Sequence, residues 1–594
     1  MKKNNVIAPL LLCLSLTSCL STFNFDVKEH EHVFESTSLG PSYIKRCTYK
    51  DCNYGVMPDR NDMYDKMIEE LMSIDYNTIL NDTYFQMEDI INCVGPYDPI
   101  DSKYDKNSEL VDKNSELKNL MNSYVGDMNS FISQLYCSQI LYNSDSSNEK
   151  LKQQYADIHS NYLKHYEGYL TIFHLINDSK LKEYYFYGMN QEQINNYLKN
   201  NDPEITSLKN EQERIKLEYQ NIEDVSESNK VLELFDDYVE INNKLANKYE
   251  YSSFVDYSYA ETYNRDYIYK DTLTLVEYYK KYLTPIFEMF YQKLSKSSAL
   301  TDNDSYDYYH GIVNNKFFDN YYSNKVVNDY MNSLVNENED LSFKSEFEKL
   351  FEDGNYFLAE DSPMTAYEAR IPTFRTPILF FSGDYQNAFT VVHEFGHYMN
   401  DKYNSGYYTQ SYDLLETHSQ GNEMLFLSYL INNIPELAAN LILIENIYST
   451  IATSLVAMSV NLFEIAIYTN TYNGYNSDIL MKDGKITSNE YDLLFESILT
   501  DFNIKDKVNN KYWRLVVFNS PGYYISYSTS AISSLQLLIL SETQGYQKAI
   551  ESYYKLFEYT DYNSKLGYND VLSYANLTAF NDETTYQTIY DYFI

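Results

Sequence analysis

TVVHEFGHYMNDKYNSGYYTQSYDLLETHSQGNEMLFL, residues 390–427, contains the pattern H-E-x-x-H once, as His393, Glu394 and His397. Residues i and i+4 of a helix lie on one face, so His393 and His397 can offer two imidazole nitrogens to one point. Zinc in hydrolases takes three protein ligands and keeps a fourth position for water. Glu394, next to the first histidine, is placed to take a proton from that water. The stretch therefore predicts a hydrolytic zinc site on a helix.

The third ligand is expected at Glu416, in a second polar cluster. Eighteen residues separate His397 from Glu416, which leaves room for one helix to end, a turn at 404–406, and a second helix that returns the carboxylate to the metal. The runs before His393 and after Glu416 are apolar enough for two partly buried helices. The alternative is that the histidines are packed core residues on amphipathic helices. The surrounding sequence favours the metal site.

Composition limits the possible fold and partners. The chain has 594 residues, which argues for several packed subdomains. It has 66 tyrosines but only 17 glycines and 12 prolines, which favours long helices over sheets and turns. The formal net charge of -40 makes a nucleic-acid partner improbable, because phosphate binding needs a basic surface.

Residues 1–18 are predicted to be a signal peptide. Lys2 and Lys3 precede a short apolar run, and the sequence L-T-S-C that ends at Cys19 resembles a bacterial lipobox. Cleavage before Cys19 would remove both lysines, so the net charge would become -40 - 2 = -42. We expect no other stretch to reach the roughly 20 apolar residues of a membrane span. We therefore expect a bacterial membrane lipoprotein, anchored outside the cytoplasm by lipid at Cys19 alone. The alternatives for residues 1–18 are an ordinary signal peptide and a short buried helix.

Residues 19–58 are expected to form a tether. Cys47 and Cys52 could close a disulfide or, together with His30 and His32, could bind a second metal ion. A plain polar stalk is a third interpretation, and the sequence leaves all three open.

The remaining chain reads as a mainly α protein. We divide it into an N-terminal helical lobe, 59–355, and a catalytic zinc-binding helical region, 356–594. Apolar spacing of three and four residues predicts helices over 62–74, 204–222, 230–249, 274–294, 438–469, 491–502 and 530–540.

One segment departs from the helical pattern. Between Tyr356 and Phe381, prolines, β-branched residues and aromatics predict one or two short strands ahead of the motif helix, and the prolines restrict these strands to an edge. An edge beside the metal could pair with an extended peptide. A simple loop is the alternative.

Three motifs together resemble the M3 family of zinc metallopeptidases, the oligoendopeptidase F and thimet oligopeptidase group. They are H-E-F-G-H at 393–397, E-T-H-S-Q-G-N-E at 416–423 and S-P-G-Y-Y-I-S-Y at 520–527. Residues 231–267 also look like the helical region upstream of the site in that family. The resemblance covers roughly 60–594. It implies an elongated, two-lobed helical metallopeptidase with a deep substrate channel, which admits short unfolded peptides and excludes folded proteins, and with a small β element beside the zinc.

The resemblance assigns roles to the residues of the first two motifs. His393, His397 and Glu416 would bind one Zn2+ per chain, and Glu394 would be the general base that returns its proton to the leaving amine. Glu423, two helical turns after Glu416, could orient a ligand.

The third motif supplies substrate contacts in the family. Tyr524 and Tyr527 match tyrosines that donate hydrogen bonds to the tetrahedral intermediate, and Tyr523 would bind substrate. Gly522 is expected to let this segment move onto the substrate. Many relatives have a histidine shortly before Pro521, and this chain has none there.

These assignments predict a monomeric zinc metalloendopeptidase that hydrolyses internal bonds of short oligopeptides. The 398–415 loop is shorter than is usual in the family and has the spacing of certain zinc aminopeptidases, so aminopeptidase is the enzymatic alternative. The N-E-G-type surround and the G-x-M-E-N signature of those enzymes are absent from the chain. A surface lipoprotein that binds peptides without cleaving them is the non-enzymatic alternative.

Overall fold

The computed structural model describes most of the chain from residue 34 onward. The described residues are 34–39, 42–47, 55–56, 62–73, 89–93, 108–187, 194–195, 202–297, 304–335, 342–359, 366–403, 410–470, 486–558 and 566–594, apart from positions 146, 178, 180, 223, 375, 384 and 487. The signal peptide, Cys19, His30, His32 and Cys52 lie outside these residues, so the lipid anchor and the disulfide or metal site near Cys47 stay predictions. The division at 355/356 also stays a prediction.

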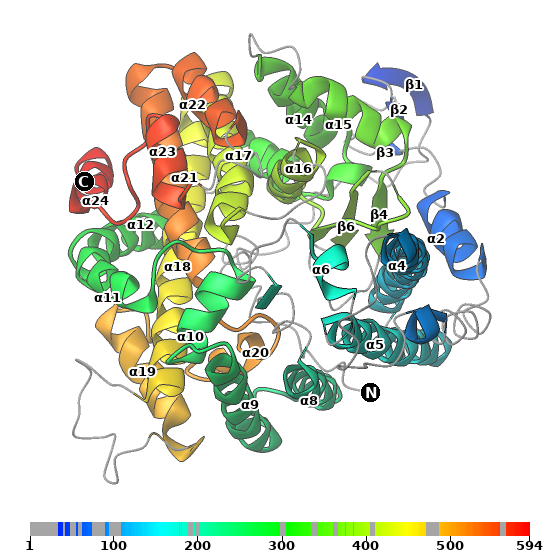
Figure 1. Ribbon diagram of the computed structural model, residues 1–594. Helices are drawn as coiled ribbons and strands as arrows, with labels where there is room; N and C mark the ends of the chain where they lie inside the picture. The colour runs from blue at the N-terminus through cyan, green and yellow to red at the C-terminus, as the bar shows by residue number, and fades with distance from the viewer. Residues whose placement is uncertain are drawn as a thin grey trace.

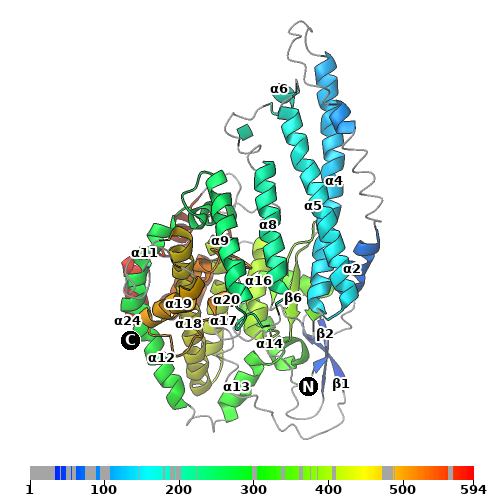
Figure 2. The same ribbon diagram turned by 90° about the horizontal axis from the view of Figure 1, so that it is seen from below.

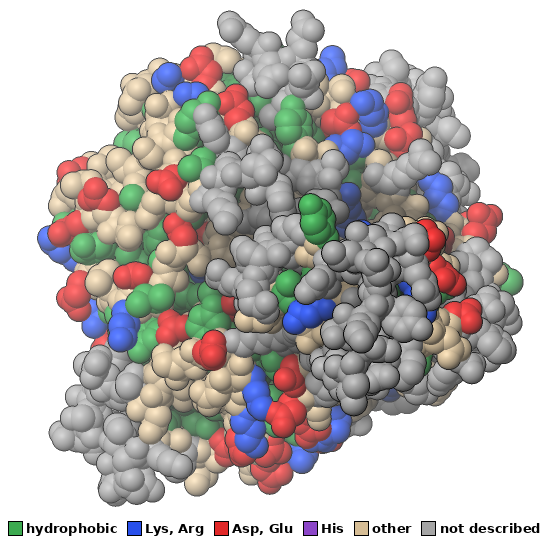
Figure 3. Space-filling model, viewed as in Figure 1, with side chains coloured by type: hydrophobic (Ala, Val, Ile, Leu, Met, Phe, Trp, Pro, Cys, Tyr) green, Lys and Arg blue, Asp and Glu red, His purple; other side chains and the backbone are tan. Residues whose placement is uncertain are grey.

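Long helices at the N-terminal side give the molecule its elongated shape. Helices α4 (Ser108–Ser144) and α5 (Glu149–Asn177) pack side by side and extend well beyond the rest of the body (Figure 2). Helix α2 (Asp62–Ser73) packs against α4. Acidic side chains are dispersed among basic and uncharged ones over the described part of the face in Figure 3.

The helices predicted from apolar spacing are confirmed to within a few residues at most ends. They correspond to α2, α8 (Pro203–Gln220), α9 (Lys230–Lys248), α18 (Glu436–Thr469), α19 (Tyr491–Asp501) and α21 (Ile525–Gln544). The helix predicted at 274–294 is part of a longer run in which α11 (Tyr269–Tyr278), a π-helical turn η2 (Tyr279–Leu283) and α12 (Thr284–Ser297) follow each other directly. Further helices in the described part of the chain are α6 (Lys182–Tyr185), α10 (Phe254–Tyr257), η1 (Ser258–Thr262), α13 (Asp304–Asn314), η3 (Phe317–Asp319), α14 (Tyr321–Ser333), α15 (Phe343–Glu352), α16 (Ala388–Tyr403), α17 (Tyr412–Asn433), η4 (Ser488–Glu490), α20 (Trp513–Val516), α22 (Tyr546–Glu558), α23 (Tyr568–Tyr574) and α24 (Glu583–Phe593).

Helix α18 runs through the centre of the core beside α17 and α21 (Figure 1). By length and composition its stretch Ala438–Thr469 could cross a membrane, so the expectation that no stretch outside the signal peptide is apolar enough was wrong. In the structure 89% of its most apolar window is buried inside the protein. A helix that is apolar all round is typical of a core helix as well as of a membrane span, and here it packs against other helices of the same chain.

A small sheet stands directly before the motif helix, as predicted. Its strands are β4 (Tyr356–Ala359), β5 (Tyr367–Ala369) and β6 (Ile378–Ser382), in the order β4-β6-β5. Strand β6 is wholly buried, pairs in parallel with β4 and pairs antiparallel with β5. Strand β5 is therefore an edge of this sheet within the described residues, and it contacts helix α16. The expectation that the prolines restrict these strands to an edge was wrong for β6, which is central because Pro377 lies just before it and not within it. The predicted fold class, a mainly helical elongated body with a small β element, is confirmed.

Part of the predicted tether is a second sheet. Strands β1 (Phe34–Leu39), β2 (Ser42–Cys47) and β3 (Gly55–Val56) pair antiparallel in that order. Strand β2 lies against α15 and β3 against η3. Strands β2 and β3 thus contact helices of the body.

Candidate metal centre

Helix α16 carries His393, Glu394 and His397. The helix starts where the Asn387 side chain accepts a hydrogen bond from the backbone N–H of Thr390, at 3.0 Å, which satisfies one of the free N–H groups of the first turn. Four of its apolar residues are fully buried and fix the rotation of the helix about its axis; they are Val391, Val392, Phe395 and Met399.

Helix α17 carries Glu416 and begins at Ser411, whose hydroxyl accepts a hydrogen bond from the backbone N–H of Asp413. Gly396 lies where α16 and α17 approach each other closely. A Cβ atom at Gly396 would lie 2.7 Å from the carbonyl oxygen of His418 and 2.7 Å from Cα of Ser419. Only glycine allows the two helices to approach this closely, and this approach brings the carboxylate of Glu416 to the two histidines.

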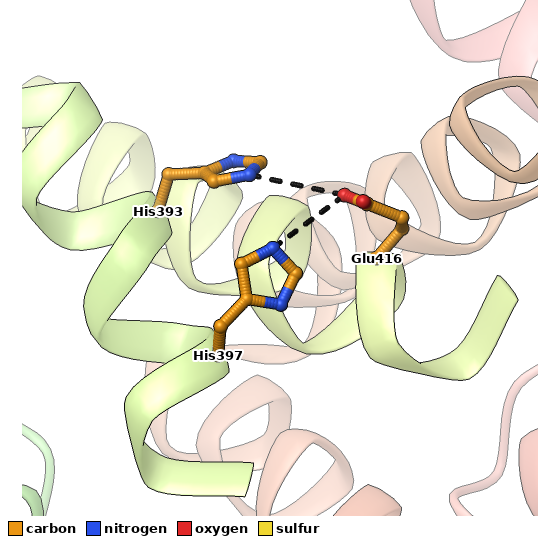
Figure 4. Close-up of side chains that lie close together, drawn as sticks. All are labelled: His393, His397 and Glu416. Atoms are coloured by element: carbon orange, nitrogen blue, oxygen red, sulfur yellow. Dashed lines mark ion pairs between the residues drawn. The ribbon is translucent and has the colours of Figure 1, made fainter. Parts of the chain in front are cut away.

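The three predicted ligands converge (Figure 4). Nε2 of His393 and Nε2 of His397 each lie 3.8 Å from Oε2 of Glu416, and the three ligand atoms all lie within 4.8 Å of one another. Each histidine side chain is 20% exposed, whereas Glu416 is 2% exposed. The point between them is therefore enclosed by protein on the Glu416 side and accessible from the histidine side.

Polar neighbours fix the orientation of these ligands. Nδ1 of His393 lies 2.5 Å from Oε1 of Glu423, so Nε2 is left to face the site. Glu416 accepts hydrogen bonds from Ser419 Oγ, at 3.2 Å on Oε2, and from the hydroxyl of Tyr523 on Oε1. The orienting role predicted for Glu423 matches this contact, whereas the bond from Tyr523 to Glu416 was not anticipated.

Glu394, the predicted general base, is buried beside the histidines on α16. Its side chain is buried, and it accepts a hydrogen bond from the backbone of Glu368 in the edge strand β5. Burial raises the pKa of Glu394 to about 7, with the carboxylates of Glu416 and Glu423 also raising it and His393 opposing them. A carboxylate with a pKa near neutrality can both take and return a proton at physiological pH.

The two histidines have opposite electrostatic environments. Burial alone would lower the pKa of His393, but its hydrogen bond to Glu423 and the nearby carboxylates outweigh burial and raise the pKa to about 9. Burial, with the positive charge of His393, lowers the pKa of His397 well below its usual value. Burial thus favours the neutral form of His397, which is the form that binds a metal ion.

The tyrosines of the third motif lie beside the ligands, at the start of α21. The rings of Tyr523 and Tyr527 are 5.3 Å apart and those of Tyr524 and Tyr527 are 5.8 Å apart. Burial raises the pKa of Tyr527 well above 10, and the charges of Glu416 and Glu394 raise it further. Tyr523 and Tyr527 therefore adjoin the carboxylates of the site, while the separate roles predicted for Tyr523, Tyr524 and Tyr527 stay predictions.

Three residues that hold the site together were not found from the sequence. Arg265 and Asp413 form a buried ion pair at 3.1 Å beside the tyrosine turn, and both carboxylate oxygens of Glu464 accept a hydrogen bond from the backbone N–H of Gly522. Two weak signals existed: arginine is much scarcer than lysine in this chain, and Asp413 lies one turn before Glu416.

Comparison with known proteins shows a similarity of fold. No family model matches the chain, and no curated protein matches it in sequence. Among solved structures, Pz peptidase A with inhibitor 2 is similar over 88% of this chain and 97% of its own, with a TM-score of 0.57 and 14% identity. A putative oligoendopeptidase F from Bacillus anthracis str. Ames is similar over 84% of this chain and 97% of its own, with a TM-score of 0.55 and 14% identity. Oligoendopeptidase-F from Enterococcus faecium is similar over 90% of this chain and 97% of its own, with a TM-score of 0.52 and 14% identity.

Proposed function

We propose that this chain is a zinc-dependent endopeptidase that hydrolyses internal bonds of short oligopeptides. The observation that carries the proposal is the convergence of His393, His397 and Glu416 with the buried carboxylate of Glu394 beside an edge strand. The fold similarity to structures described as Pz peptidase and oligoendopeptidase F supports the same class of reaction.

The donor set suits zinc. Two imidazoles and one carboxylate are the ligands of many hydrolytic zinc sites, which keep a fourth position open. Ligand atoms about 2.1 Å from a tetrahedral zinc ion lie about 3.4 Å apart. The distances of 3.8 Å from each Nε2 to Oε2 of Glu416 need only a small contraction to reach this spacing.

Each residue then has a defined task. Zinc bound there would lower the pKa of a water molecule and polarise the scissile carbonyl group. Glu394 takes a proton from the attacking water and passes it to the leaving amine. The tyrosine hydroxyls at 524 and 527 are the candidate donors to the oxyanion, and one such donor is commonly worth roughly 3 kcal/mol.

Strand β5 is the element that we propose to hold the peptide. It is an edge strand, and the backbone of Glu368 within it already reaches Glu394. An extended peptide paired with this edge would place its backbone across the metal site. Short unfolded peptides are therefore the proposed substrates. We also propose that the protein is a monomer, anchored to the outer side of the bacterial membrane by lipid at Cys19.

The test uses internally quenched peptides with blocked N-termini. We expect the wild-type protein, carrying one zinc per chain, to cut them, a chelator to stop cleavage, and Glu394→Gln to remove it while keeping the metal. Glu436→Gln, at an exposed position on α18, is the matched control and should cut normally. Zinc-loaded wild type that cuts nothing, or Glu394→Gln that cuts equally well, would reject the proposal. Cleavage only of peptides with a free N-terminus would favour an aminopeptidase.

A further inference from the structure

The turn that carries the tyrosines is hydrogen-bonded at three successive carbonyl groups. The carbonyl of Pro521 accepts from the hydroxyl of Tyr263 at 3.0 Å, that of Gly522 from Arg265 at 2.7 Å, and that of Tyr523 from Arg265 at 3.2 Å. Both donors come from the segment between η1 and α11, far away in the sequence. The contacts favour a fixed turn rather than the mobile one that Gly522 led us to expect.

Arg265 links this turn to the start of helix α17. Its side chain is fully buried and forms an ion pair through Nε with Oδ1 of Asp413, at 3.1 Å. Ser526 completes the connection, because its hydroxyl accepts from Arg265 at 2.7 Å and donates to Asp413 at 2.6 Å. The hydroxyl of Tyr267 donates to the other oxygen of Asp413 at 2.6 Å. Guanidinium presents its donors in a planar fork, and a lysine cannot serve so many acceptors at once.

Gly522 adds a second constraint. Its φ is +80°, and a Cβ atom there would collide with the side chain of Ser258. Its backbone N–H donates to both carboxylate oxygens of Glu464, at 3.0 and 3.1 Å. The turn is thus held on its N–H side by Glu464 and on its carbonyl side by Arg265.

The fixed turn matters because of where it puts one hydroxyl. Asp413 lies one helical turn before Glu416 on α17, and Tyr523, whose carbonyl Arg265 holds, donates its hydroxyl to Oε1 of Glu416. We infer that Arg265 is a positioning residue, which fixes the turn 521–523 against α17 so that Tyr523 stays hydrogen-bonded to the third ligand of the metal site. The effect on turnover rests on the proposed function, but the positioning itself does not.

The kinetic test is a cycle of Arg265→Lys, Tyr523→Phe and the double variant. Small displacements at a reacting centre can cost up to about 100-fold in rate, so we expect Arg265→Lys to lower kcat by about 10- to 100-fold and to change KM little. If Arg265 acts through Tyr523, Arg265→Lys has almost no further effect in the Tyr523→Phe background. An equal loss in both backgrounds would overturn the inference.

A second readout needs no turnover. The visible absorption spectrum of the Co2+-loaded protein reports on the donors around the metal, and loss of the hydrogen bond to Glu416 should shift it. We expect Arg265→Lys to shift the spectrum in the same direction as Tyr523→Phe, with no further shift in the double variant. Wild type that binds Co2+ but cleaves no peptide would reject the proposed function and leave this test valid. A spectrum of Arg265→Lys identical to that of wild type would overturn the inference.

The chain offers a matched control at Arg514. This side chain is also buried, pairs with Asp492 at 2.6 Å and donates to the carbonyls of Ser226 and Ser228. Arg514→Lys should lower stability as Arg265→Lys does, but should leave kcat and the Co2+ spectrum unchanged. If Arg265→Lys does not fold, Ser526→Ala takes its place in the cycle, since it removes one partner of Arg265 and keeps the ion pair.

Discussion

His393 and Glu423, which lie on different helices, meet at 2.5 Å through Nδ1 and Oε1. Glu423 is two helical turns beyond Glu416, so the same face of α17 supplies one proposed metal ligand and the group that orients another. The contact leaves Nε2 of His393 as the nitrogen that faces the site.

Removal of this carboxylate should weaken metal binding without removing a ligand. Partners of this kind typically contribute 10- to 100-fold to metal affinity, so we expect Glu423→Ala to raise the Kd for zinc by about that factor. Glu423→Gln should have a smaller effect, because its amide oxygen can still accept from Nδ1. Competition with a chromogenic chelator measures both, with Glu436→Gln as the control, and an unchanged affinity in Glu423→Ala would contradict the assigned role.

The sequence was sufficient to locate the three converging side chains because their signals are local. His393 and His397 are four residues apart, and Glu416 lies within a short polar cluster on the next helix. The site's framework depends instead on contacts between distant segments. Arg265 donates a hydrogen bond to the carbonyl group of Gly522, and Glu464 accepts one from the backbone N–H of Gly522. No spacing rule within one sequence predicts such pairs.

The fold shows the same division between local and distant information. Apolar spacing located seven helical ranges, which do not include the long helices α4 and α5, and prolines, β-branched residues and aromatics located the strands before α16. The order β4-β6-β5 depends on how the strands pair in space, and the membrane-like composition of α18 has meaning only once its neighbours are known. Burial of that helix by α17 and α21 is a tertiary property.

Replacement of Gly396 tests whether the close approach of α16 and α17 is required. Added volume in a packed contact commonly costs about 1–3 kcal/mol, so we expect Gly396→Ala to lower the free energy of unfolding by about that amount and to weaken zinc binding. Gly126→Ala is the control, because Gly126 lies within α4 with no atom within 4 Å of its added Cβ. This variant should have a free energy of unfolding about 0.5–1 kcal/mol higher than that of wild type. Fluorescence of Trp513, the one tryptophan and fully buried, reports unfolding in urea. Equal stability of the two variants would contradict the packing argument.

Glu464 should make stability depend on pH. Burial raises its pKa from 4.5 to about 8, so between these values the folded protein holds a proton that the unfolded chain has lost. The contribution of Glu464 to the free energy of unfolding is fully present below about pH 4.5 and is lost as the pH rises through about 8. Between these values the free energy of unfolding falls by up to about 1.4 kcal/mol per pH unit. Glu464→Gln cannot titrate, so its Tm should fall less than that of wild type between about pH 5 and 8. Identical slopes in the two proteins would show that Glu464 is ionised throughout.

Zinc should stabilise the fold through His397. A ligand that binds only the folded state contributes about 2.7 kcal/mol when its free concentration is 100 times Kd, so zinc should raise the Tm measured by Trp513 fluorescence. His397→Ala leaves two of the three converging ligands and should lose most of this rise. His159→Ala, on α5 and not among the converging ligands, should keep it. If zinc raised the Tm of His397→Ala as much as that of wild type, the ion would have to bind elsewhere, and the assignment of this centre would fail.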